Sequence, residues 1–164
     1  MHIRNKLAGA AAVMGASVLL VAGTATNASA GAAEIKQYRN AQTGLCLDSD
    51  AKGKVYTKGC GADNPYQQWE RKVVDGQIML RNVATRLCLS RETGNLTNPS
   101  PPYSTRVATR TCVGWELDHW WELKVDGRTR LINVDADNAL DSNTKGNAYL
   151  KNYTADNTYQ QWYE

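Results

Sequence analysis

Two segments of the chain share four polar and aromatic residues at identical spacing, in the order Asp, Tyr, Asn, Tyr. The two sets are Asp48, Tyr56, Asn64 and Tyr66, and Asp141, Tyr149, Asn157 and Tyr159. An ionised Asp accepts hydrogen bonds from two hydroxyl groups, and an Asn amide both donates and accepts. A Tyr ring offers an apolar face to C–H groups and a hydroxyl at its edge. A sugar, with its hydroxyl groups and apolar ring face, matches these groups.

The two segments, residues 48–69 and 141–162, align without a gap and are identical at 13 of 22 positions. A recent duplication or the shared needs of a fold would also produce this identity. A middle segment tests that interpretation. It retains its cysteines and Leu89, but it lacks the Asp and both Tyr of the set. In our alignment these three positions are Ser90, Ala108 and Asp118, respectively. The fold therefore tolerates loss of the set, and we expect ligand sites in the first and third segments only.

The three segments belong to three repeats. Each repeat ends in a Trp-containing motif: Tyr66-Gln67-Gln68-Trp69, Asp118-His119-Trp120-Trp121 and Tyr159-Gln160-Gln161-Trp162. We align Trp69, Trp121 and Trp162, which lie nine residues after Cys60, Cys112 and Tyr153. Recurrence over such distances indicates a repeat architecture. The repeats span about 34–75, 76–126 and 127–164, and the middle one has about ten extra residues.

All four cysteines follow residue 30, which suits an oxidising compartment. Cys46 and Cys60 occupy the same two repeat positions as Cys88 and Cys112, and the third repeat has Ala139 and Tyr153 there. Joint loss predicts the disulfides Cys46–Cys60 and Cys88–Cys112, worth about 3 and 3.5 kcal/mol on the chain-entropy model. A metal site is the alternative, but no repeat has a CxxC spacing or a His partner.

We expect residues 1–30 to be a signal peptide. Arg4 and Lys6 form a positive start, residues 7–22 are apolar or small, and Ala28-Ser29-Ala30 is a cleavage signature. Removal lowers the net charge from +3 to roughly +1, which predicts no binding to nucleic acid or anionic membrane. No membrane span follows. We therefore expect a secreted, extracellular monomer, residues 31–164, without membrane insertion.

Short runs with partial period-2 alternation predict strands at residues 35–39, 55–57, 77–80, 106–109 and 130–134. Turn signals lie between them, at Thr43-Gly44, Asp75-Gly76, Asp126-Gly127 and Lys145-Gly146. No window has a sustained helical stripe. The pattern predicts an all-β barrel or sandwich.

Three β repeats, two of which end in an intact Gln-x-Trp motif and one in a degenerate copy, resemble the ricin B-type β-trefoil lectins over essentially the whole chain after residue 30. The resemblance implies an all-β β-trefoil of three four-stranded repeats with pseudo-threefold symmetry, in which the Gln-x-Trp side chains are structural. The chain has no Phe, so the expected core consists of Leu47, Leu89, Leu140, Trp69, Trp121 and Trp162. The implied function is secreted carbohydrate binding through shallow sites in repeats 1 and 3.

The implied site residues are the two sets of four given above. The pattern is closer still to a mannose-binding lectin of this family, in which an Asp, an Asn and two Tyr of each repeat form the pocket. That pattern has its Asn where this chain has Gly61 and Thr154, so Asn64 and Asn157 are proposed as substitutes. Lys58 and Lys151 replace an apolar residue near the pocket. They are either solvated bystanders or favour acidic sugars.

Catalysis and cofactors find little support in the sequence. After loss of the leader His119 is the only histidine, and in our alignment it takes the Gln position of the motif. The paired cysteines leave no thiol, no Ser has a visible base, and no carboxylate pair stands out. Asp135 begins a calcium-like run that has Gly146 at the place of the required Glu. We expect no enzyme, no cofactor and no metal.

The rival interpretation is a protein-binding trefoil, such as a protease inhibitor, that uses the insert of repeat 2. This insert, Asn95–Tyr103, contains three prolines and is expected to be an exposed, stiff loop. A tolerated surface insertion is the simpler explanation. A lectin subunit that joins a toxin or hydrolase non-covalently is a third option.

Overall fold

The computed structural model describes residues 33–92, 94–95, 98–99, 105–114 and 116–164, so the predicted signal peptide lies outside the described residues. None of the described residues forms an α-helix. The strands are β1 (Glu34–Lys36), β2 (Arg39–Asn40), β3 (Cys46–Ser49), β4 (Val55–Lys58), β5 (Trp69–Val74), β6 (Gln77–Asn82), β7 (Cys88–Arg91), β8 (Gly94–Asn95), β9 (Asn98–Pro99), β10 (Val107–Arg110), β11 (Trp120–Val125), β12 (Arg128–Asn133), β13 (Asn138–Ser142), β14 (Ala148–Asn152) and β15 (Trp162–Tyr163). Three short 3-10 helices are η1 (Pro65–Gln67), η2 (Glu116–Asp118) and η3 (Thr158–Gln160).

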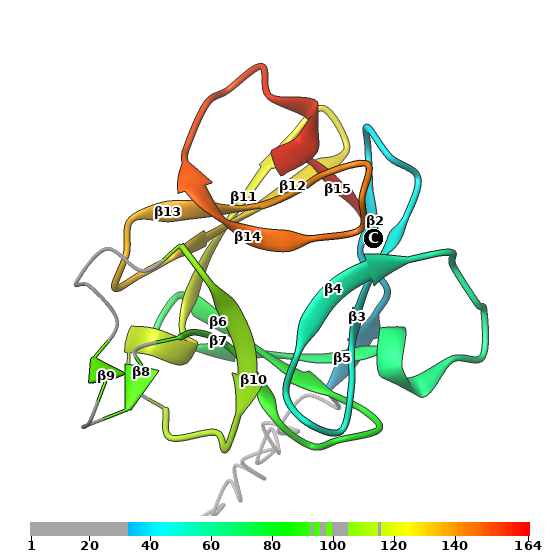
Figure 1. The fold of residues 1–164 in the computed structure, drawn as a ribbon. Coiled ribbons are helices and arrows are strands. Elements are labelled where there is room, and N and C mark those ends of the chain that lie inside the picture. The colour runs from blue at the N-terminus through cyan, green and yellow to red at the C-terminus, as the bar shows by residue number, and fades with distance from the viewer. Residues whose placement is uncertain (1–32, 93, 96–97, 100–104, 115) are drawn as a thin grey trace, which may run out of the picture. The chain divides into compact units, whose positions relative to one another are not determined.

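Six antiparallel strand pairs are arranged as three equivalent repeats around one axis (Figure 1). The barrel consists of the pairs β5–β6, β11–β12 and β15–β2, of which the last joins the two ends of the domain. The pairs β3–β4, β7–β10 and β13–β14 form the second set of hairpins. This arrangement is a β-trefoil and confirms the predicted fold class.

The turn chemistry explains two of the barrel hairpins. Val74 pairs with Gln77 and Val125 with Arg128, so each turn has two residues, Asp-Gly in both cases. Both residues of each turn have positive φ, for example 49° at Asp75 and 80° at Gly76. Two-residue turns of this kind match the right-handed twist of the paired strands, and Asp-Gly favours them.

A threefold set of Leu and Trp side chains fills the core. Leu47, Leu89 and Leu140 are fully buried, and the carbonyl oxygen of each accepts a hydrogen bond from a buried indole Nε1–H. The donors are Trp69, Trp120 and Trp162, at 3.2, 3.0 and 3.2 Å. This confirms the structural role of Trp69 and Trp162.

The prediction that Trp121 belongs to this core is wrong. Trp120 is fully buried, whereas 46% of Trp121 is exposed. The two are neighbours on β11, and successive side chains of a strand point to opposite faces. The sequence alignment failed because repeat 2 has one residue fewer than the other repeats between Cys112 and its core Trp.

Both predicted disulfides are confirmed, with Cα–Cα distances of 5.1 Å for Cys46–Cys60 and 5.0 Å for Cys88–Cys112. The predicted insert Asn95–Tyr103 lies largely outside the described residues. Its described part contributes to the small two-stranded ladder of β8 and β9. In the part of the chain that the structure describes, no helix is both long and apolar enough to cross a membrane.

Three asparagines tie each repeat to the loop of the repeat before it. The Nδ2 group of Asn82 donates to the Tyr66 carbonyl at 2.8 Å, and that of Asn133 donates to the Leu117 carbonyl at 3.0 Å. Asn40 closes the circle by donating to the Tyr159 carbonyl at 2.7 Å. In repeats 1 and 3 this Asn therefore holds the loop that carries the second Tyr of the predicted site.

A second circle of backbone hydrogen bonds surrounds the axis. Its members are Thr57 N–H to the Gly146 carbonyl at 2.8 Å, Thr109 N–H to the Gly53 carbonyl at 2.8 Å, and Leu150 N–H to the Thr105 carbonyl at 2.6 Å. Each repeat thereby donates to one neighbour and accepts from the other. The three hairpins β3–β4, β7–β10 and β13–β14 are joined into one cap.

Gly53→Ala is expected to destabilise the protein by about 2–4 kcal/mol, because two costs add. Gly53 has φ of +87°, and a Cβ there would lie 2.6 Å from the Thr109 carbonyl oxygen of the neighbouring repeat. Gly59→Ala is the matched control, since a Cβ at Gly59 meets nothing within 4 Å. Chemical denaturation followed by circular dichroism measures both. Equal stabilities of the two variants would show that the cap does not need a glycine at position 53.

Candidate binding sites

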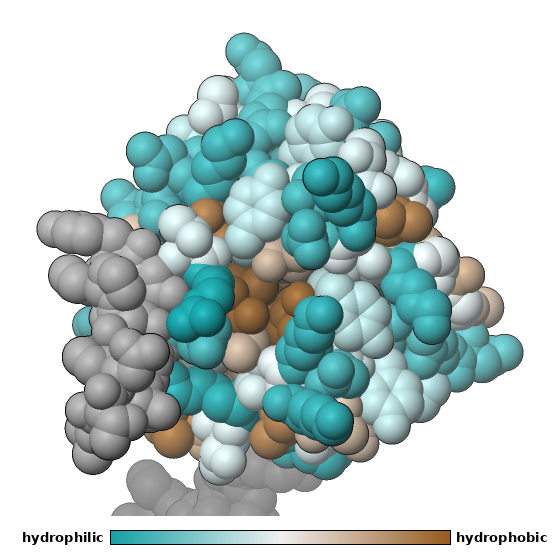
Figure 2. Space-filling view, viewed as in Figure 1, coloured by the Kyte–Doolittle hydropathy of each residue, from teal (hydrophilic) through white to brown (hydrophobic). Residues whose placement is uncertain are grey.

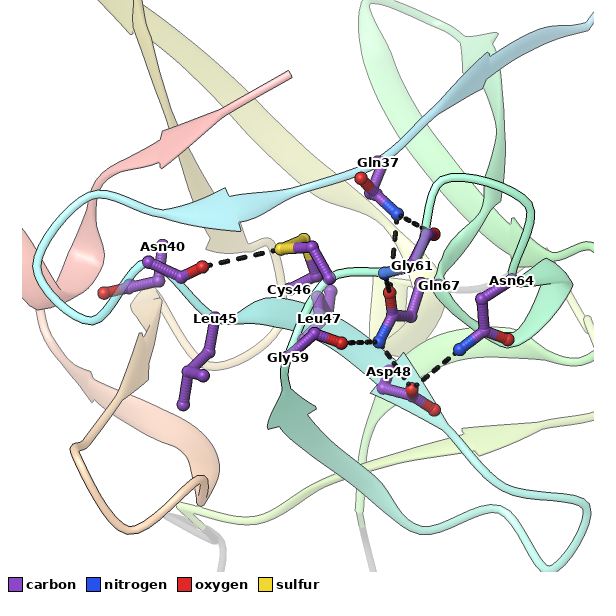
Figure 3. Close-up of a disulfide and its surroundings, with 12 residues drawn as sticks. Gln37, Asn40, Leu45, Cys46, Leu47, Asp48, Gly59, Gly61, Asn64 and Gln67 are labelled. Carbon is purple, nitrogen blue, oxygen red and sulfur yellow. Dashed lines mark hydrogen bonds between the residues drawn. A yellow bond between two sulfur atoms is a disulfide. The ribbon is translucent and has the colours of Figure 1, made fainter.

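The Gln of the Gln-x-Trp motif organises the candidate site of repeat 1. Gln67 is fully buried, and its Oε1 accepts from the Gly61 N–H at 2.8 Å. Its Nε2 donates to the Gly59 carbonyl at 3.0 Å and to Oδ2 of Asp48 at 2.9 Å (Figure 3). The amide thus fixes the loop after β4 and orients the Asp48 carboxylate on β3. The implied structural role of this Gln is confirmed.

Repeat 3 has the same network. The Gln160 Oε1 accepts from the Thr154 N–H at 2.9 Å, and its Nε2 donates to the Asn152 carbonyl at 2.9 Å and to Oδ2 of Asp141 at 3.1 Å. Two copies of one buried network therefore present two similarly held carboxylates.

The two asparagines position other groups of the site. Asn64 is the N-cap of η1, where its Oδ1 accepts from the Tyr66 N–H at 3.1 Å, and its Nδ2 lies 3.5 Å from Oδ2 of Asp48. Asn157 caps η3 in the same way and donates to Oδ2 of Asp141 at 2.9 Å. Each Asn therefore places the following Tyr and supports the carboxylate at the same time.

The Asp and the first Tyr of each set are cross-strand neighbours, because Asp48 pairs with Tyr56 and Asp141 with Tyr149. Burial of the phenol raises the pKa of Tyr56 and Tyr149, and the negative charge of the adjacent carboxylate raises each pKa further. Both phenols stay protonated well beyond neutral pH. Their hydroxyl groups can therefore donate as well as accept.

In repeat 1 these side chains line a depression of about 200 Å³. Its residues include all four of the predicted set and Lys58, and they are Asp48, Ser49, Asp50, Ala51, Tyr56, Lys58, Asn64 and Tyr66. Asp48 is 2% exposed and belongs to its floor, whereas Tyr66 is 40% exposed. Oδ1 of Asp48 is buried, and the Tyr56 side chain interacts with the same carboxylate. We call this depression site 1 and the equivalent residues of repeat 3 site 3.

Repeat 2 has a rebuilt network in place of the site. Asp118 occupies the position of Gln67, which the sequence alignment had given to His119. Leu117 likewise occupies the position of Tyr66, which the alignment had given to Asp118. Both predicted positions were therefore displaced by one residue toward the C-terminus. The Asp118 Oδ2 accepts from the Val113 N–H at 2.9 Å, which reproduces the acceptor half of the Gln amide. Asp118 has no amide group to donate to a carboxylate, and Ser90 stands in place of Asp48. Two facing carboxylates would repel each other, so the loss of the Asp at position 90 compensates for the carboxylate that Asp118 places in the Gln position.

Among the described residues, no group of three or more His, Cys, Asp or Glu side chains could hold a metal ion. The three-repeat barrel and its buried Gln-x-Trp networks define a β-trefoil of the lectin type. The chain belongs to the ricin-type beta-trefoil lectin domain family, whose model matches residues 34–162. The fold and the family together define a carbohydrate-binding lectin domain.

Two solved structures show the same fold. ThreeFoil, a designed 3-fold symmetric protein, is 20% identical, with a TM-score of 0.65 over 79% of this chain and 96% of its own. A GlcNAcα1-4Gal-releasing endo-β-galactosidase from Clostridium perfringens is 25% identical, with a TM-score of 0.64 over 78% of this chain. This chain covers 31% of that enzyme's length. A comparison with curated proteins found no match.

Proposed function

We propose that the protein is a secreted lectin that binds glycans at sites 1 and 3 and not at the equivalent position of repeat 2. The observation that carries the proposal is the carboxylate held by a buried Gln and a capping Asn, present in two copies and beside a Tyr in each. Asp48 lines one depression together with Tyr56, Asn64 and Tyr66, so carboxylate, amide and phenol groups converge where the hydroxyl groups of a sugar could bind.

The aromatic residues of site 1 supply the second half of sugar recognition. Tyr66 is exposed at the edge of the depression and Tyr56 lines it, so a pyranose ring can place its C–H face against a phenol ring. The presence of a similar domain in an endo-β-galactosidase supports a carbohydrate ligand. The two disulfides and the predicted signal peptide at residues 1–30 support export.

Binding to a glycan array, followed by calorimetric titration with the best ligand, tests the proposal. We expect a stoichiometry of two sugars per chain and a single-sugar Kd near the millimolar level, about −4 kcal/mol, because the site is shallow. A surface that presents several copies of the glycan is expected to raise the apparent affinity by roughly 10² or more. Absence of binding across a broad array would contradict the proposal. It would favour a protein ligand at the insert of repeat 2.

A further inference from the structure

A separate hollow lies on the pseudo-threefold axis, where the three hairpins of the cap meet. Its volume is about 380 Å³. Figure 2 shows it in the centre of the face, with apolar side chains at its floor and hydrophilic ones around it. All three repeats contribute to its lining: Lys52, Gly53, Lys54, Val55, Glu92, Arg106, Val107, Ala108, Asn147 and Ala148.

Two small residues, Ala108 and Ala148, line the hollow where repeat 1 has larger ones. Ala108 pairs with Ser90 as Tyr56 pairs with Asp48, so it takes the place of the site tyrosine in repeat 2. Ala148 takes the place that Val55 has in repeat 1. Ala148 leaves space at the axis where repeat 1 has Val55, whereas the side-chain volume lost at Ala108 lies at the position of the site tyrosine, which in repeat 1 does not line the hollow.

The lining is cationic. Lys52, Lys54 and Arg106 stand against a single carboxylate, Glu92, which lies 3.0 Å from the Arg106 guanidinium. The floor, by contrast, consists of Val and Ala side chains. Because Glu92 pairs with Arg106, the net positive charge of the lining comes from Lys52 and Lys54, and a net charge over a low-dielectric floor attracts ions of the opposite sign.

The hollow borders both proposed sugar sites. Tyr56 forms a β-bridge with Asn147, and Tyr149 forms one with Arg106, so a lining residue of the hollow lies beside the first Tyr of each site. In addition, the Lys54 Nζ lies 6.0 Å from the centre of the Tyr56 ring. A glycan held in site 1 or site 3 can therefore extend toward the axis without leaving the protein surface.

We propose that the axial hollow is an anion subsite, which takes the carboxylate or sulfate ester of a sugar adjoining the one held in site 1 or site 3. The extension to a neighbouring sugar rests on the proposed function, whereas binding of the anion itself does not. The preferred ligands are accordingly acidic glycans. The cations that select them line the hollow and are Lys52 and Lys54, since Arg106 already pairs with Glu92.

The test uses three small probes, inorganic sulfate, glucuronate and neutral glucose, and follows the backbone amides of Val55, Val107 and Ala108 by NMR. We expect both anions to shift these signals saturably and glucose to leave them unchanged. The double variant Lys52→Gln with Lys54→Gln is expected to weaken anion binding at least about fivefold, as is added salt. Lys72→Gln, an exposed lysine on β5 outside the hollow, is the matched control and should have no effect.

The anion subsite and the proposed lectin function can be tested separately. The variant Asp48→Ala with Asp141→Ala should retain sulfate binding, because it leaves the hollow unchanged. Anion binding without any glycan binding would overturn the lectin proposal and leave the subsite standing. Saturable binding of only sulfate or only glucuronate would support the subsite and show whether it takes a sulfate ester or a carboxylate. Shifts that do not saturate, or that persist in the double lysine variant, would overturn the subsite.

Discussion

Trp120→Ala is expected to lower the free energy of unfolding by about 3–5 kcal/mol, whereas Trp121→Ala should lower it by less than about 1 kcal/mol. The two residues are adjacent in the chain, but only Trp120 is fully buried and donates its indole N–H to the Leu89 carbonyl. Its truncation leaves a large cavity in the core and a buried acceptor without a donor.

Denaturant unfolding of both variants measures the difference, with circular dichroism as the probe. The neighbouring substitution controls for effects on strand propensity, since both residues belong to β11. Equal losses, or a larger loss for Trp121→Ala, would contradict the assignment of Trp120 to the Gln-x-Trp position.

Asp48→Ala with Asp141→Ala is expected to weaken glycan binding at least about 100-fold. Each carboxylate supplies charge-assisted hydrogen bonds to sugar hydroxyls, worth about 1.5–3 kcal/mol each. Either single substitution should halve the calorimetric stoichiometry. Ser90→Ala, at the equivalent position of repeat 2, should leave both affinity and stoichiometry unchanged.

The loss of a carboxylate also has a structural cost. In repeat 2 the missing carboxylate is accompanied by Asp118 in the Gln position, but Asp48→Ala leaves the Gln67 Nε2 without one of its acceptors. We expect a destabilisation of about 1–3 kcal/mol per site, so the folded state of each variant is checked by its melting temperature. Folded variants that bind as tightly as the parent would exclude Asp48 and Asp141 from the sites.

The fold and the disulfides could be predicted because they follow from patterns within one chain. Joint loss of two cysteines in repeat 3 identified the pairing, and Asp-Gly turns between alternating segments marked two hairpins. These features depend on local chemistry that repeats itself. The predicted set of repeat 1 also converges on one depression, because Asp48 and Tyr56 stand opposite each other in a hairpin.

The remaining features depend on alignment and on distant contacts. Two adjacent tryptophans made repeat 2 ambiguous by one residue, and a one-residue shift exchanges the buried and exposed faces of a strand. Aligning Asp118 with Gln67 would have resolved the ambiguity. Both side chains accept a hydrogen bond from the backbone N–H of the residue after the second Cys of their repeat, which is Val113 or Gly61. The axial hollow combines residues of three repeats, and no local pattern marks it.

Sites 1 and 3 also differ in the sequence separation of the contacts that complete them. The loop of Tyr66 is held by Asn82, only 16 positions along the chain, whereas that of Tyr159 is held by Asn40, 119 positions away. Contacts over long separations form late in folding, because the entropy of closing the intervening chain opposes them. Site 1 can therefore assemble from neighbouring segments, but site 3 is completed only when the first and last strands meet.

Local opening around Asn40 would accordingly remove site 3 and leave site 1 intact. The relation also works in reverse, since a ligand that binds only the closed form stabilises that form. A glycan bound in site 3 would therefore stabilise the contact between the first and last strands of the domain.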